Sequence, residues 1–88
     1  MFFVTKLPAS NATLHRTPQG DWWLLAATPD SQDLTTTERQ TFLQDLRQVG
    51  GVLTAVYRPQ RLNYQLQDQL GGRLGARVQP IFDEKNSR

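Results

Sequence analysis

The feature that most constrains this chain is an uninterrupted run of six apolar residues, Trp22–Ala27. In an extended strand, successive side chains point to opposite faces of the sheet. The even-numbered members of the run therefore line one face, and the odd-numbered members, Trp23 and Leu25 among them, line the other. A strand that is apolar on both faces is typical of a sheet covered on both sides. The fold must therefore provide cover for two faces.

The residues around this run predict a β-hairpin and one further strand. Residues 12–17 and 22–28 favour extended chain, and Pro18-Gln19-Gly20-Asp21 separates them. Proline fixes φ near about −65° and glycine accepts positive φ, so this segment forms a turn. Phe2–Leu7 is aromatic and β-branched and is closed by Pro8, which predicts another strand.

A helix is expected to follow the polar loop at 29–34. Thr35 and Glu38 are spaced as in a capping box, in which each side chain bonds the free backbone N–H of the other residue. Four apolar residues then recur at helical spacing: Phe42, Leu43, Leu46 and Val49. Gly50-Gly51 predicts the end of this helix, because glycine readily takes the left-handed cap conformation.

The second half of the chain predicts a strand, a helix and a strand. Val52–Tyr57 is apolar and β-branched, as strands are. Pro59 suits the first position of a helix, in which leucine recurs every fourth residue until Gly71-Gly72. These leucines are Leu62, Leu66 and Leu70. Arg77–Phe82 is the last predicted strand, placed at a sheet edge or a bulge because Pro80 cannot donate a ladder hydrogen bond.

Together these elements predict an α+β fold in the order ββ(β)αβαβ. Residues 52–82 would form a βαβ unit with parallel strands, and the hairpin would add antiparallel ones. The expected architecture is a two-layer sandwich, with a mixed sheet of four to five strands and two helices on one face. A chain of 88 residues holds one small domain, assigned to residues 1–82, and residues 83–88 form a polar tail.

No catalytic, metal-binding or cofactor-binding set is apparent. His15 is the only histidine and the chain has no cysteine. Ser10 and Ser31 lie in polar loops without the surroundings of a nucleophile elbow. The glycine-rich segment 71–75 follows a predicted helix instead of opening one, as a phosphate-binding loop would. The sequence therefore predicts neither an enzyme nor a bound cofactor or metal.

The chain has no apolar run near the roughly 20 residues that span a bilayer, and its start does not resemble a secretory signal. We therefore expect a cytoplasmic protein without a membrane partner. Eight of its ten basic residues are arginine, a bias that suggests a bacterial genome.

The apolar second face predicts a protein partner. Two helices cover one face of the sheet, and exposing the other costs about 25 cal/mol per Å² of apolar area. A second copy of the chain would remove this cost, so we expect a homodimer or a higher homo-oligomer. Internal cover by the first strand and the 29–34 loop is the alternative. The candidate interface residues are Trp22, Trp23, Leu25 and Tyr57.

Binding of RNA or single-stranded DNA is the alternative function. Residues 47–82 contain five arginines and one acidic residue. Arginine holds phosphates and tyrosine stacks on unpaired bases. The candidate residues are Arg58, Arg61, Tyr64, Arg73 and Arg77. Phosphate binding weakens steeply with added salt and an apolar interface does not, which separates the two functions.

Overall fold

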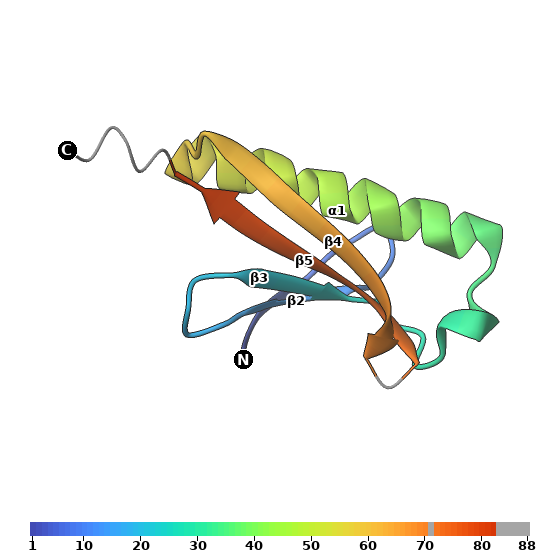
Figure 1. Ribbon diagram of the computed structural model, residues 1–88. Helices are drawn as coiled ribbons and strands as arrows, with labels where there is room; N and C mark the ends of the chain where they lie inside the picture. Colours follow the sequence, from blue (N-terminus) through green and yellow to red (C-terminus); the bar gives the residue numbers. More distant parts are fainter. Residues whose placement is uncertain (71, 83–88) are drawn as a thin grey trace.

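Five antiparallel strands and one long helix make up the fold in this computed structural model, which describes residues 1–70 and 72–82, with the backbone alone for 68–70 (Figure 1). In chain order the elements are β1 (Phe2–Lys6), β2 (Thr13–Arg16), β3 (Trp22–Leu25), the short 3₁₀ helix η1 (Ser31–Asp33), α1 (Thr36–Tyr57), β4 (Arg61–Leu70) and β5 (Arg73–Ile81). The strand order is β1-β2-β3-β5-β4, and each neighbouring pair is antiparallel.

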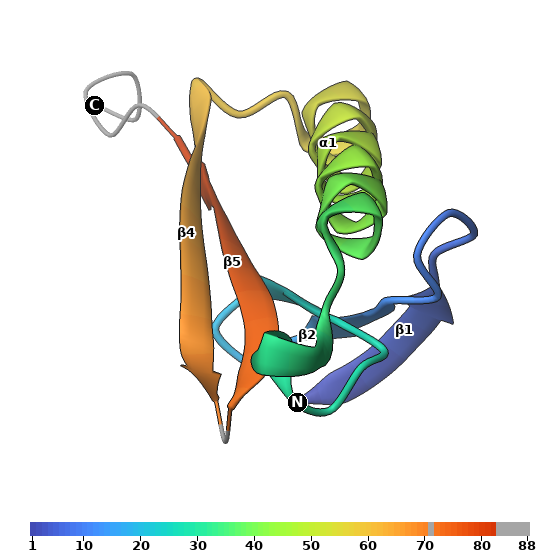
Figure 2. The ribbon, with the colours of Figure 1, turned by 90° about the vertical axis from the view of Figure 1, so that its right-hand side faces the viewer.

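The helix covers one face of the sheet, so the fold has two layers. Figure 2 shows α1 on one side of a strongly twisted sheet, with β4 and β5 toward one flank and β1 toward the other. We call the face toward α1 the inner face and the opposite one the outer face. Buried residues of β2, β3 and β5, such as Leu24 and Val78, pack on the inner face against buried residues of α1, such as Phe42. The predicted α+β class is confirmed.

The hairpin predicted around Gly20 is confirmed. Thr17 N–H donates to the Asp21 carbonyl at 2.9 Å, and Gly20 takes a φ of 92°. The side chains of β3 also divide between the two faces of the sheet as predicted. Trp22 and Leu24 are buried on the inner face, and the odd-numbered residues of β3 are half-buried on the outer face. One helix thus covers only one of the two apolar faces of β3.

The predicted start of the helix is also confirmed. Thr35 Oγ1 accepts a hydrogen bond from the Glu38 N–H at 3.1 Å, and Thr35 N–H donates to Glu38 Oε1 at 2.9 Å. Both bonds complete the capping box, so two otherwise unpaired N–H groups of the helix start have partners. The bonds from Thr35 also lower the pKa of Glu38, because they stabilise its carboxylate.

The predicted end of the helix at Gly50-Gly51 is wrong, and Val52–Tyr57 is helix instead of strand. Each glycine costs the helix about 1 kcal/mol relative to alanine, an amount that burial of Val49 and Leu53 against the sheet outweighs. The helix ends at Arg58, whose φ of 50° is left-handed, immediately before Pro59. Proline here follows the cap of a helix and does not begin one.

The second predicted helix is also wrong, because residues 61–70 form β4. A spacing of four residues places Leu62 and Leu66 on one face of a helix, but equally on one face of a strand. Tyr64 lies between them on that face, and the residues in between are Asn63 and amide-bearing glutamines. This alternation is that of a strand. The predicted parallel βαβ unit is therefore replaced by a β4–β5 hairpin, and the sheet is antiparallel, not mixed.

The last strand, β5, begins four residues earlier than the predicted Arg77. It pairs with β3 only over residues 75–78, so Pro80 faces Leu62 of β4 and lies beyond the end of β3. The predicted edge position of this strand is therefore wrong, because β5 lies between β3 and β4. Pro80 is tolerated because it lies beyond the stretch that pairs with β3, where the sheet needs no second ladder donor. Gly72 has a φ of 83° in the turn before β5. Gly71 and the predicted tail 83–88 lie outside the described residues.

A buried carboxylate ties α1 to the turn between β1 and β2. Asp45 is only 2% exposed, and its oxygens accept hydrogen bonds from Ser10 N–H at 2.7 Å, Ser10 Oγ at 2.6 Å and Ala9 N–H at 3.3 Å. Burying a charge is costly unless it is well hydrogen-bonded. These three bonds offset that cost and fix the position of the turn relative to the helix.

The fold predicts different effects for two leucines that the sequence placed in equivalent roles. Leu46→Ala should lower the free energy of unfolding by about 2–4 kcal/mol, because Leu46 is 6% exposed in the core. Leu66→Ala should cost less than about 1 kcal/mol, because Leu66 is 55% exposed. Urea unfolding of both variants, at a concentration at which the chain is monomeric, measures the difference, and equal losses would contradict the assignment of β4.

Candidate protein-binding surface

An apolar groove of about 350 Å³ lies between α1 and β1. It lies on the flank where Figure 2 shows β1 turning away from the helix. Among its lining residues, Thr5 and Gln48 alone are neither aliphatic nor aromatic. The sheet side contributes Val4, Thr5, Leu7, Leu14 and Trp22, and α1 contributes Gln48, Val49, Val52, Leu53, Val56 and Tyr57. We call this the α1–β1 groove.

The rim of the α1–β1 groove is strongly exposed. Val52 and Val56 on α1 are 52% and 64% exposed, and Val4 on β1 is 46% exposed. Large apolar patches are uncommon on monomeric proteins and mark interaction sites when they are contiguous. The rim and the groove together expose aliphatic and aromatic side chains from two elements that are far apart in the sequence.

The groove lies along an unpaired sheet edge. β1 pairs with β2 alone, and all five of its residues are exposed. The register passes from Phe3 opposite His15 to Thr5 opposite Leu14, so Val4 has no residue opposite it. Such a bulge redirects a side chain. Here Val4 lines the groove, on the edge of β1 that pairs with no strand within residues 1–70 and 72–82.

The four predicted interface residues lie on two different faces. Trp22 and Tyr57 meet on the inner face, with ring centroids 6.4 Å apart, and both line the groove. Trp23 and Leu25 lie on the outer face of β3 and are half-buried. The sequence therefore named two residues of the groove. It missed Val52 and Val56, because it assigned them to a strand.

The outer face of the sheet carries a row of aromatic and charged side chains. Phe3, His15, Trp23 and Arg77 occupy paired positions on four successive strands. Phe3 and His15 contact edge to face, with centroids 5.8 Å apart. Arg77 is ion-paired with Asp21, which reduces the net charge of this face. α1 lies on the opposite side of the sheet and does not cover the row.

His15 is the one histidine of the chain, and its surroundings favour the neutral ring. Burial, and to a lesser extent the positive charge of the N-terminus, lowers the pKa of His15. A ring nitrogen lies 2.9 Å from Thr13 Oγ1, at hydrogen-bond distance. Through these contacts His15 packs and hydrogen-bonds within the outer face of the sheet.

The lowered pKa of His15 predicts an acid-dependent loss of stability. The unfolded chain binds a proton near pH 6.5 and the folded chain only at lower pH, so protonation favours unfolding. The contribution is fully present above pH 6.5 and is lost as the pH falls through the folded pKa. Between pH 7.5 and pH 5.0, the free energy of unfolding measured with urea should fall less for His15→Gln than for the original chain. Equal decreases in the two proteins would contradict the lowered pKa of His15.

The five predicted nucleic-acid residues do not form one site. The Arg77 guanidinium pairs with Asp21, with Nε 3.0 Å from Oδ2, and Arg73 donates to the Ala26 carbonyl at 2.8 Å. Arg61 and Arg73 lie at opposite ends of the β4–β5 hairpin.

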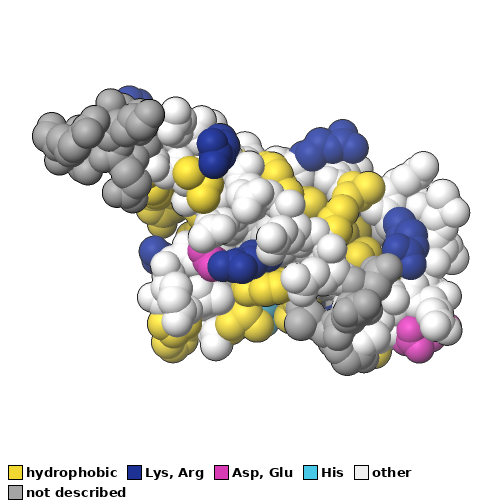
Figure 3. All heavy atoms as spheres, in the orientation of Figure 1, with side chains coloured by type: hydrophobic (Ala, Val, Ile, Leu, Met, Phe, Trp, Pro, Cys, Tyr) yellow, Lys and Arg dark blue, Asp and Glu magenta, His cyan; other side chains and the backbone are white. Residues whose placement is uncertain are grey.

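Tyr64 faces inward, and a Cβ at Gly50 would overlap its hydroxyl. Arg58 and Arg61 are exposed near the end of α1 and the start of β4. Figure 3 shows basic side chains spread over the visible face instead of gathered together.

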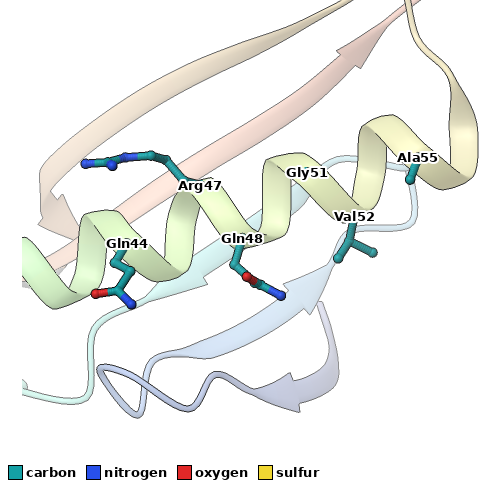
Figure 4. A pocket seen from close by; sticks show the side chains of 6 residues that line it. All are labelled: Gln44, Arg47, Gln48, Gly51, Val52 and Ala55. Atoms are coloured by element: carbon teal, nitrogen blue, oxygen red, sulfur yellow. The ribbon is translucent and has the colours of Figure 1, made fainter.

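A second hollow, of about 420 Å³, lies along the side of α1 away from the sheet. Figure 4 shows that its labelled side chains all come from this helix, beside the short residues Gly51 and Ala55. No second element encloses it among the described residues, so it offers no buried site. Within residues 1–70 and 72–82, no cluster of three potential metal ligands occurs. In the same ranges no helix has both the length and the apolar character needed to cross a membrane.

Comparisons of the chain with protein-family models, with curated proteins and with solved structures gave no match. The functional argument therefore rests on the geometry of the chain itself.

Proposed function

We propose that this chain is a non-enzymatic protein-binding module that takes an extended apolar segment of a partner protein into the α1–β1 groove. The observation that supports this proposal is an unpaired sheet edge directly beside an apolar groove. In strand addition, the backbone of the bound segment pairs with the edge strand, and alternate side chains enter pockets. Affinity comes from the backbone bonds and specificity from the pockets.

The groove defines the chemistry of the segment. β1 is five residues long, so about five residues of the partner can pair with it. Every second side chain of that segment would point toward α1, where Val49, Val52 and Val56 form an aliphatic wall. The segment is therefore one in which apolar residues alternate with polar ones. Thr5 and Gln48 offer polar groups beside it.

Selection from random displayed decapeptides tests the groove directly. We expect the selected peptides to carry alternating apolar residues. Val52→Asp and Val56→Asp should each weaken peptide binding at least about tenfold, because a carboxylate would lose its hydration against an apolar ligand. Both positions are more than half exposed, so the variants should keep the fold. Isothermal titration of a selected peptide measures the change.

Gln44→Asp is the matched control, because Gln44 lies on the same helix outside the groove. It should bind the peptide as the original chain does. Peptide binding that survives both valine substitutions, or that falls equally with Gln44→Asp, would contradict the proposed groove.

A single-stranded RNA at low salt tests the alternative function. We expect no measurable binding, because Arg73 and Arg77 already bond within the chain. RNA binding that falls steeply with salt and is lost in the Arg58→Glu/Arg61→Glu double variant would favour the nucleic-acid function instead.

A further inference from the structure

We infer that two copies of this chain associate by antiparallel pairing of β4 with β4, which joins two five-stranded sheets into one. β4 is the other edge of the sheet, and among the residues that the structure describes it pairs with β5 alone. This edge lies across the sheet from the α1–β1 groove, so the inference is independent of the proposed function. The occupant of the β4 edge in this dimer is a second copy of this chain, and the sequence of β4 supplies the reasons.

From Arg61 to Gln67, the β4 edge lacks the features that usually keep a sheet edge from pairing. Those features are short strands, proline, lysine and bulges. β4 is ten residues long and contains neither proline nor lysine. Its register with β5 is regular from Arg61 to Gln67, and it shifts only beyond this stretch, between Gln67 and Leu70. Tyr64 is 45% and Leu66 is 55% exposed on its inner face, although both are on the side toward α1.

The residue pattern of β4 is complementary to itself. When two copies pair antiparallel about Tyr64, Leu62 of one copy lies opposite Leu66 of the other on the inner face. On the outer face Asn63 lies opposite Gln65, so amide faces amide. Apolar and hydrogen-bonding pairs across strands each stabilise a sheet.

The charges of β4 fit the same register. The strand has one basic residue, Arg61, and one acidic residue, Asp68. Pairing about Tyr64 places Arg61 opposite the uncharged Gln67 of the second copy. This register therefore places no two like charges directly opposite each other. Like charges at opposite positions would destabilise the pairing.

This pairing closes after two copies. An axis perpendicular to the sheet relates identical strands, so the interface is isologous and both α1 helices lie on the same side. Pairing of β1 with β4 would instead be head-to-tail and would give a larger ring or an open filament. In the closed dimer, both β1 edges remain at the outer ends of the joined sheet, where each α1–β1 groove can still receive a segment.

Light scattering coupled to gel filtration tests the dimer. At micromolar concentration the chain should show twice its mass of 10.0 kDa. Leu66→Lys should shift it to the monomer, because two lysines would enter the apolar side of the interface. Val4→Lys is the matched control at the other edge and should remain dimeric.

A monomeric original chain at all concentrations would overturn the inference. So would a dimer that Val4→Lys abolishes and Leu66→Lys does not. Peptide binding by the Leu66→Lys variant separates the two claims, since loss of the dimer leaves the α1–β1 groove intact.

Thiol crosslinking tests the register, because the chain has no cysteine of its own. A mixture of the Asn63→Cys and Gln65→Cys variants should oxidise to a disulfide-linked dimer, because the two cysteines lie directly opposite each other, whereas in either single variant they are diagonal neighbours about 7–8 Å apart. Either variant alone should crosslink several-fold less. Equal crosslinking in the single variants and the mixture would contradict pairing about Tyr64.

Discussion

The close approach of α1 to β4 is the contact on which the rest of this structure depends. One helix must cover the inner face of five strands, and it cannot reach both flanks. Gly50 has no side chain, so the helix lies directly against Tyr64 on β4, with Leu62 nearby. The helix is therefore placed toward β4 and β5, and the opposite flank stays open. The α1–β1 groove is the consequence of that asymmetric position.

A second contact gives the groove fixed walls. Asp45 lies on the flank of α1 toward β1 and holds the β1–β2 turn through Ser10 and Ala9. The turn follows β1 directly, so the edge strand is held at one end relative to the helix. A preorganised groove loses less conformational entropy on binding than a mobile one. The two proposals thus assign separate roles to the two sheet edges, one for a partner segment and one for a second copy.

The sequence predicted the features that depend on a few adjacent residues. The turn at Gly20 and the capping box at Thr35 depend only on local backbone geometry. The wrong predictions concern segments whose secondary structure is determined by tertiary contacts. Gly50 is tolerated inside the helix because the chain needs a close approach to Tyr64, and this cannot be seen in the local sequence. The four-residue spacing of Leu62 and Leu66 fits both a helix and a strand, and only the alternation with Asn63 and the glutamines distinguishes them.

The residues of the candidate surface were named only in part for the same reason. The need to cover apolar strands drew attention to Trp22 and Tyr57, which line the groove. Val52 and Val56 could not be assigned to it while their segment was read as a strand. The most direct test of the account is the pair Gly50→Ala and Gly51→Ala. Gly51→Ala should raise the free energy of unfolding by about 0.5–1 kcal/mol through helix propensity, because its Cβ meets open space. Gly50→Ala should lower it by displacing Tyr64, and equal stabilisation by both would contradict the close packing of α1 on β4.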